Sequence, residues 1–170
     1  MRADGFIQVN EKLETTAKNV WAMGDCTGGP RFTHVSFDDF RIIRDNLNGA
    51  NRVTTGRLVP SCLFTDPELA RVGMTEQEAV AAGKKFKIAK APMKAVLRTR
   101  TLSETRGFLK ALIGDDQKIL GFVGFGYGAG EIMAVIQLGM QAGLPYTTLR
   151  EMTIAHPTLA EGVVVLLSAV

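Results

Sequence analysis

Cysteine is scarce in this sequence, and its spacing argues against the common cysteine-based scaffolds. The 170 residues contain two cysteines, Cys26 and Cys62, which form no CxxC pair and have no histidine at zinc-finger spacing. Disulphide frameworks and structural zinc sites need more thiols, or thiols at closer spacing. We therefore expect two reduced thiols and no metal site.

Long apolar runs are also absent. Residues 1–5 contain no hydrophobic segment of signal-peptide length, and the apolar stretch at residues 163–170 is far too short to cross a bilayer. The sequence therefore predicts a cytoplasmic protein with no membrane partner. Its composition, 46% hydrophobic and 22% charged, is typical of a folded globular chain and excludes disordered and collagen-like classes.

Residues 84–100 contain several basic residues and no acidic residue, although the formal net charge of the whole chain is only +3. A basic run can bind nucleic acid, but this one contains a single aromatic residue, Phe86, and follows no helix-turn-helix or RRM pattern. A solvated strand-and-loop face is the stronger interpretation, so we expect no nucleic-acid partner. The basic residues of the segment are Lys84, Lys85, Lys87, Lys90, Lys94, Arg98 and Arg100.

Residues 1–50 contain too few elements to close a core of their own. Residues 6–9 and 19–23 are expected to be extended, and a loop follows at 26–30. A helix is expected from Ser36, with Gly49 at its C-terminal cap. Its apolar residues recur at helical spacing and are Phe37, Phe40, Ile43 and Leu47. We interpret residues 1–50 as the end of a larger domain.

Residues 51–58 are polar and are interpreted as a linker, which places a second domain at residues 59–170. Strands are expected at 59–64, 86–91, 107–113 and 119–125, and the last two are joined by a hairpin turn at 114–117. Helices are expected from Thr75 to Gly83, over 131–142, near Thr148 and from Thr158. Strands followed by helices predict a two-layer α+β domain with an antiparallel sheet.

Residues 15–25, TTAKNVWAMGD, form the most specific pattern in the first domain. An apolar strand ends at Gly24, which allows a ligand to approach the backbone, and Asp25 can accept hydrogen bonds from hydroxyl groups. A Gly-Asp pair alone is an ordinary turn. The longer pattern resembles the second flavin fingerprint of the class I pyridine nucleotide-disulphide oxidoreductases, in which this carboxylate binds the ribityl chain of FAD. The resemblance implies that role for Asp25.

The next segment continues this resemblance, because in the family it reaches the flavin. The corresponding residues here are Arg31, Phe32, Thr33 and His34. A helix N-terminus offers free N–H groups and partial positive charge, which would stabilise negative charge at the N1/O2 edge of the flavin. Thr33 is the best candidate for this backbone contact. His34 can also be a capping or core histidine.

Two motifs in the second domain are similar to the dimerisation domain of the same family. Residues 64–73, FTDPELARVG, are similar to its opening, and residues 128–131, GAGE, resemble the start of one of its helices. The glycines around this helix start do not have the G-x-G-x-x-G spacing of a dinucleotide site. They are better explained as a strand-to-helix bend.

Residues 156–161, HPTLAE, carry the strongest chemical signal. They are similar to the H-P-T-x-x-E of the family's C-terminus, where the histidine is the acid-base group and the glutamate supports it. The resemblance implies these roles for His156 and Glu161. Thr158 and Glu161 also fit a capping box for the last helix, and that alternative stays open.

The family resemblance covers essentially the whole chain and implies a function. In this family NAD(P)H reduces FAD, the flavin reduces a cysteine pair, and the dithiol reduces a small-molecule or disulphide substrate. The His–Glu dyad comes from the other subunit, so a homodimer is expected. The redox cysteines and the residues that bind NAD(P)H lie earlier in the family's sequence and are absent here. We therefore expect the isolated chain to bind FAD poorly and to be inactive.

The subfamily and one alternative remain open. Residues 32–43, FTHVSFDDFRII, are closest to the reactive-chlorine-resistance oxidoreductases, a branch related to mercuric reductase. Mercuric reductases replace the dyad histidine, whereas this chain keeps His156, and dihydrolipoamide dehydrogenases usually have small residues in the earlier segment. A metal-linked or oxidative-stress reductase is therefore favoured. The alternative is a stand-alone dimerisation or interaction module without chemistry, favoured by Met1 and the missing cysteines.

Overall fold

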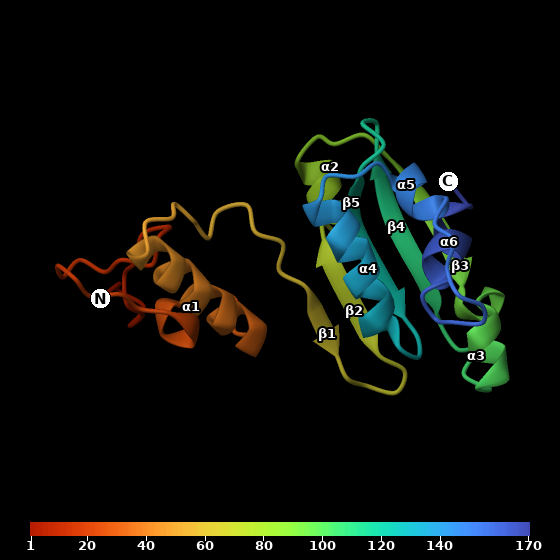
Figure 1. Ribbon diagram of the computed structural model, residues 1–170, viewed down its shortest axis with the longest axis horizontal. Coiled ribbons are helices and arrows are strands. Elements are labelled where there is room, and N and C mark those ends of the chain that lie inside the picture. The colour runs from red at the N-terminus through yellow and green to blue at the C-terminus, as the bar shows by residue number, and fades with distance from the viewer. The chain divides into compact units, whose positions relative to one another are not determined.

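Two structural units make up the chain (Figure 1). The computed structural model describes residues 1–170, and the contacts within it gather in Met1–Val59 and in Pro60–Val170. The α+β class predicted from the sequence is confirmed, since the second unit combines an antiparallel sheet with helices. None of the helices has both the length and the apolar character needed to cross a membrane.

A five-stranded antiparallel sheet forms the centre of the second unit. Its spatial order is β1-β2-β5-β4-β3, so β5 lies in the middle and β1 and β3 are the edges. The hairpin predicted between β4 and β5 is present, with Phe108 opposite Phe125 and Lys110 opposite Val123. The strands are β1 (Ser61–Leu63), β2 (Leu69–Gly73), β3 (Phe86–Pro92), β4 (Phe108–Gly114) and β5 (Ile119–Phe125).

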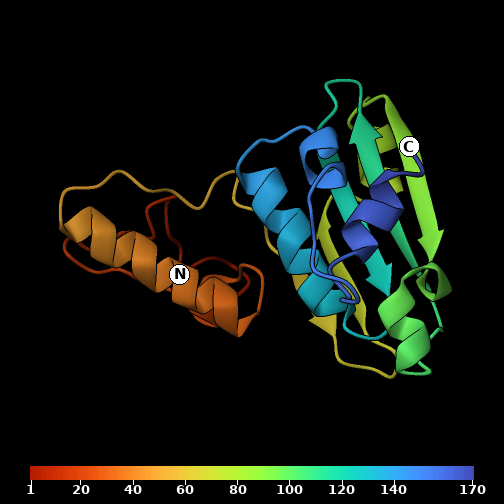
Figure 2. The same cartoon turned by 45° about the vertical axis from the view of Figure 1, so that its right-hand side comes forward.

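Helices cover one face of this sheet (Figure 2). Helix α4 (Ala129–Gln141) contacts β2 and β5, and α6 (Gly162–Leu167) contacts β3 and β4. Burial of a large apolar side chain stabilises a fold by roughly 1.5–3 kcal/mol, so this layer holds the unit together. The largest fully buried side chains between sheet and helices include Val72, Leu109, Phe122, Ile132, Ile136, Val163, Leu166 and Leu167.

The shorter helices lie at the ends of the strands. Helix α2 (Glu76–Ala81) begins with the predicted capping box: the Thr75 hydroxyl accepts the Glu78 N–H at 3.1 Å, and the Glu78 carboxylate accepts the Thr75 N–H at 2.7 Å. The backbone N–H of Thr75, and then its hydroxyl, lower the pKa of Glu78. The others are η2 (Met93–Ala95), α3 (Leu97–Thr101) and α5 (Tyr146–Arg150).

One central strand and one helix are missing from the sequence-based prediction. Strand β2 pairs with both β1 and β5, and its burial alternates, with Ala70 and Val72 buried and Arg71 exposed. The strand is short, begins two residues after Pro67 and ends at Gly73, so the sequence pattern resembles a turn. Helix α3 was also not predicted, because its five residues carry no apolar periodicity.

The first unit contains one turn of 3-10 helix, η1 (Gly24–Thr27), and one long helix, α1 (Thr33–Leu47). The segments at residues 6–9 and 19–23, which the sequence predicts to be extended, form no regular strand. These segments form only the isolated bridges Val9–Thr15 and Glu14–Trp21. A β-strand is stabilised by a continuous series of hydrogen bonds to a neighbouring strand, and these segments form no such series within the chain.

Helix α1 begins at Thr33, earlier than the predicted Ser36, because Phe32 is already an extended N-cap residue. Three of the four apolar residues that recur at helical spacing, Phe37, Phe40 and Leu47, are exposed. Phe37 and Leu47 are 59% and 62% exposed, whereas Val35, Asp39 and Ile42 are buried. The buried face therefore includes a carboxylate, and an apolar stripe is left uncovered by the rest of Met1–Val59.

Candidate functional site

Gly24 starts the turn that carries the candidate flavin ligand Asp25. Its φ of +71° is rarely adopted by L-residues, and an added Cβ would lie 2.7 Å from the Ser36 hydroxyl oxygen. Its N–H donates a 2.8 Å hydrogen bond to the Asp39 carboxylate. Asp25 follows with an exposed side chain, so its carboxylate is open to a ligand.

The turn and the start of α1 together line a hollow of about 620 Å³. Of the six cofactor residues predicted from the sequence, the structure places five around it. His34 is not among them: its ring stacks on Phe32, with centroids 5.1 Å apart. The lining residues are Met23, Gly24, Asp25, Arg31, Phe32, Thr33, Ser36, Phe37 and Phe40.

The N-terminus of α1 opens at this hollow without a side-chain cap. Phe32 is the N-cap residue and cannot accept a hydrogen bond through its side chain, and the first turn contains no acidic residue. The N–H groups of a first helical turn carry partial positive charge and suit an electron-rich ligand. An acceptor carboxylate at Asp25 and donors near Thr33 therefore share one hollow, a combination that could hold a ligand with hydroxyl groups and an electron-rich edge.

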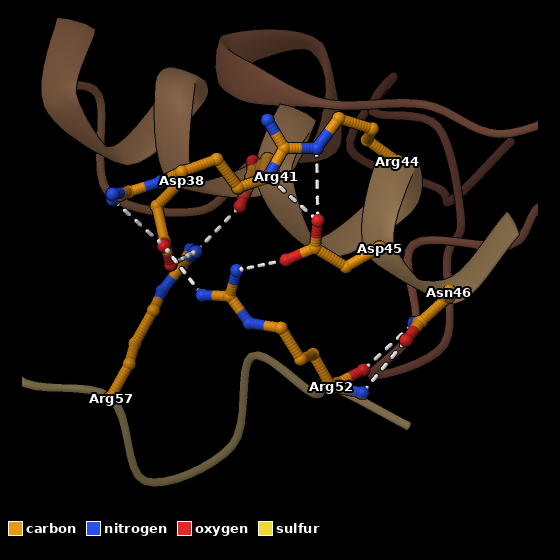
Figure 3. A network of polar contacts seen from close by, with 8 residues as sticks. Asp38, Arg41, Arg44, Asp45, Asn46, Arg52 and Arg57 are labelled. Atoms are coloured by element: carbon orange, nitrogen blue, oxygen red, sulfur yellow. Dashed lines mark hydrogen bonds and ion pairs between the residues drawn. The ribbon is translucent and has the colours of Figure 1, made fainter. Parts of the chain in front are cut away.

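Side chains of the predicted linker bind the other side of α1 (Figure 3). The Arg57 guanidinium donates to the Asp39 carboxylate at 2.6 Å and contacts Asp38 at 3.3 Å. Arg52 donates to Asp45 at 2.7 Å and to Asp38 at 3.1 Å. Arg52 and then Arg44 lower the pKa of Asp45 through hydrogen bonds.

The second candidate site lies in the loop between α5 and α6, where His156 and Glu161 are in direct contact. His156 Nδ1 is 2.7 Å from Glu161 Oε1. Glu161 Oε2 accepts the Thr158 N–H at 2.8 Å. These two hydrogen bonds, that from Thr158 first, lower the pKa of Glu161. An ionised carboxylate can only accept, so it selects the His156 tautomer that is protonated at Nδ1 and directs Nε2 to other partners.

The loop is held in place by packing near its C-terminal end. Leu159 lies so close to Gly128, at the start of α4, that an added Cβ there would be 2.5 Å from its methyl carbon. After Glu161 the chain enters α6, whose Val163, Leu166 and Leu167 are fully buried. His156 itself remains 61% exposed, so an anchored loop presents an accessible imidazole.

The helix predicted from Thr158 starts later than expected, and its capping box is incomplete. Helix α6 begins at Gly162, with Glu161 in the N-cap position. Glu161 does accept the Thr158 N–H, but the Thr158 hydroxyl is buried and has no hydrogen-bond partner. The other carboxylate oxygen of Glu161 contacts His156, so the same side chain takes part in both contacts.

The two cysteines have different surroundings. Cys26 is exposed and its thiol lies 3.2 Å from the Met23 carbonyl oxygen. Burial raises the pKa of the Cys62 thiol, and the carboxylates of Glu68 and Glu131 add to the effect. The chain contains no group of three or more His, Cys, Asp and Glu side chains arranged to hold a metal ion.

Comparison with protein families decides the classification. Residues 59–167 match the model of the pyridine nucleotide-disulphide oxidoreductase dimerisation domain, and residues 1–39 match that of the pyridine nucleotide-disulphide oxidoreductases. The chain belongs to the pyridine nucleotide-disulphide oxidoreductase family.

Individual members of this family are similar over nearly the whole chain. The probable pyridine nucleotide-disulphide oxidoreductase RclA of Escherichia coli is 41% identical over 160 residues, which are 92% of this chain and 36% of the relative. A dihydrolipoyl dehydrogenase of Thermus scotoductus is 38% identical over 160 residues, 93% of this chain and 34% of the relative. The chain therefore spans little more than a third of the length of these oxidoreductases.

A solved structure of the family has the same fold. The HOCl-induced flavoprotein disulfide reductase RclA from Escherichia coli superposes with a TM-score of 0.94 at 40% identity, over 99% of this chain and 40% of that one. The family assignment from the motifs is thus confirmed, together with its dimerisation domain.

Sequence reasoning missed several residues of the first site. Ser36, Phe37 and Phe40 line the hollow, whereas the sequence indicates only that the two phenylalanines belong to a helix. Asp39 is buried beneath the Gly24 turn. In the sequence, Asp39 can be recognised as a charged residue at helical spacing from Val35 and Ile42. This indicates a buried carboxylate only if that face of the helix is known to be the buried one.

Proposed function

We propose that this chain is the C-terminal part of an FAD-dependent NAD(P)H:disulphide oxidoreductase, or of a related metal-ion or oxidative-stress reductase, that acts as a homodimer. The observation that carries the proposal is the His156–Glu161 pair, with 2.7 Å between Nδ1 and Oε1 and an exposed imidazole. A histidine oriented by a carboxylate is a suitable general acid-base group. The names of the RclA relatives, a flavoprotein disulfide reductase induced by HOCl, favour a disulphide substrate and a role in oxidative stress.

The hollow at the start of α1 has the chemistry that FAD requires. Bound FAD accepts a hydride from NAD(P)H and delivers two electrons to a disulphide. Asp25 is exposed at the hollow and would accept hydrogen bonds from ribityl hydroxyls. The N–H of Thr33, in the uncapped first turn, would stabilise negative charge at the N1/O2 edge of the flavin. Arg31, Phe32 and His34 complete the proposed contact segment.

His156 would move the proton in the second half of the reaction. Reduction of a disulphide by NAD(P)H and one proton gives NAD(P)⁺ and two thiols, so a thiolate that leaves must be protonated. Glu161 holds Nδ1–H of the imidazole, and Nε2 is then the atom that gives and takes the proton. In the proposed homodimer each dyad serves the redox cysteines of the partner, which lie outside this chain.

The proposed domain organisation follows from the same assignment. Residues 1–50 would be the end of an FAD-binding domain, 51–58 a linker and 59–170 the dimerisation domain. The uncovered apolar stripe of α1, with Phe37, Phe40 and Leu47 exposed, supports the idea that further protein packs against it. The isolated chain is therefore expected to bind FAD poorly and to have no activity. Stoichiometric flavin retained through purification would contradict this expectation.

The test is a chimera in which this chain follows the part of Escherichia coli RclA that precedes the aligned region. NAD(P)H oxidation with a disulphide substrate is measured in wild type, His156→Gln and Glu161→Gln. We expect kcat to fall by about 10²-fold or more in His156→Gln, the usual contribution of general acid-base catalysis. The control is Glu151→Gln, which removes an exposed glutamate paired only with Arg150.

The outcomes separate the two candidate functions. Loss of turnover in His156→Gln, with bound flavin unchanged, supports the catalytic dyad. A chimera that dimerises and binds FAD, but turns over equally with and without His156, contradicts it. In that case the chain is a dimerisation module whose His156–Glu161 contact only shapes the loop.

A further inference from the structure

Asp39 is a charged residue in an apolar position of α1. Its side chain is 2% exposed and lies on the buried face with Val35 and Ile42. A buried carboxylate is strongly unfavourable unless it is paired and hydrogen-bonded. The two groups that Asp39 contacts, the Gly24 N–H and the Arg57 guanidinium, compensate for the burial of its charge.

Each carboxylate oxygen of Asp39 has its own partner. Oδ2 accepts the Gly24 N–H at 2.8 Å, and Oδ1 accepts a guanidinium N–H of Arg57 at 2.6 Å. One side chain thus connects the Gly24 turn to the middle of α1, while an arginine that follows the helix supplies the compensating charge.

The contact fixes the part of the turn from which Asp25 emerges. The Gly24 carbonyl accepts the Thr27 hydroxyl at 2.8 Å, and the Asp25 carbonyl accepts the Gly28 N–H at 3.1 Å. These bonds close the turn on itself. The bond from Gly24 to Asp39 connects the turn to α1, whose first residues line the same hollow.

We propose that Asp39 is a positioning residue of the flavin site: it holds the Gly24 turn so that the Asp25 carboxylate and the N-terminus of α1 face one ligand. This inference rests on the function proposed above, since it assumes that the hollow receives FAD. Asp39 itself does not line the hollow, so its effect on a ligand is indirect.

The surrounding network provides matched controls. Asp38 also contacts Arg57, at 3.3 Å, but it makes no bond to the turn. Arg52 binds Asp38 and Asp45 and does not contact Asp39. Figure 3 shows Arg52 and Arg57 entering the network from the segment after the helix. Asp38→Asn is thus the control for Asp39→Asn, and Arg52→Gln the control for Arg57→Gln.

The experiment measures FAD affinity in the chimera and the Gly24 amide proton in the 170-residue chain by NMR. A hydrogen bond to a charged group contributes enough that its loss should weaken FAD binding roughly ten- to a hundredfold in Asp39→Asn. Asp38→Asn should leave FAD binding close to that of wild type, because Asp38 makes no hydrogen bond to the Gly24 turn. The Gly24 amide proton should shift upfield in Asp39→Asn and not in Asp38→Asn.

Each outcome decides one question. If the wild-type chimera binds no FAD, the proposed function fails, and with it the role in flavin binding. If wild type binds FAD and Asp39→Asn binds it equally well, the positioning role is overturned while the proposed function stands. If Asp39→Asn does not fold, Arg57→Gln decides: weaker FAD binding than in Arg52→Gln supports the inference, and equal binding overturns it.

Discussion

Glu161 uses both carboxylate oxygens, one 2.7 Å from His156 Nδ1 and the other 2.8 Å from the Thr158 nitrogen. The same side chain therefore orients the imidazole and closes the loop that carries it. This double engagement explains why the pKa of Glu161 is lowered, the Thr158 N–H being the larger cause and His156 the second.

The lowered pKa predicts how the loop responds to acid. A group with a depressed pKa in the folded state adds stability above its unfolded pKa, and this stability is lost as pH falls through the folded value. The difference in unfolding free energy between wild type and Glu161→Gln should thus be constant at neutral pH and shrink below the ordinary glutamate range. Urea unfolding at a series of pH values measures it. A difference that grows as pH falls would contradict the assignment.

The packing of Leu159 on Gly128 predicts that a remote substitution disturbs the dyad. Gly128→Ala places a methyl group 2.5 Å from the Leu159 side chain and should displace the loop. In the chimera, turnover should fall at least about tenfold, since small misplacements of a catalytic group cost up to about 10²-fold. The control is Gly83→Ala, with nearly the same positive φ but open space around the new methyl group. Equal turnover in the two variants would contradict a role for the contact between residue 128 and Leu159.

A parallel pair tests the Gly24 turn. Gly24 and Gly56 have φ values of +71° and +77°, but only the Cβ added at residue 24 meets another group, the Ser36 hydroxyl. Both alanine variants should lose about 1 kcal/mol of folding stability, because alanine adopts the left-handed backbone conformation less readily than glycine. Gly24→Ala should additionally weaken FAD binding by the chimera, whereas Gly56→Ala should leave it unchanged. Thermal unfolding and flavin titration separate the two effects.

Local patterns predicted the parts of the fold whose interactions are close in sequence. The hairpin between β4 and β5 and the Thr75–Glu78 capping box each depend on neighbouring residues, and both were found as expected. Strand β2 was missed because its partners, β1 and β5, are defined only when the sheet is assembled.

The candidate sites show the same limit. Gly24, Asp25 and Thr33 are close together in sequence, and all three line one hollow. Asp39 was missed because its partners, Gly24 and Arg57, lie on either side of it and far from it in sequence. The helical spacing of Phe37 and Phe40 predicts a helix but not whether this face is buried, since amphipathic periodicity shows that a face is apolar and not what covers it.

Substitution of Thr158 changes the stability of the chain in opposite directions depending on whether its hydroxyl is an unsatisfied buried group or a helix N-cap. Its hydroxyl oxygen is buried without a hydrogen-bond partner, and an unsatisfied buried polar group costs about 1–3 kcal/mol. Thr158→Val keeps the shape of the side chain and should therefore stabilise the chain. If Thr158 were a true N-cap, the same change would destabilise it by about 1 kcal/mol. Thr75→Val is the control, because the Thr75 hydroxyl does cap α2 and its removal should be destabilising. Urea unfolding of the two variants should thus give changes of opposite sign, and a loss of stability in both would restore the capping box at residues 158–161.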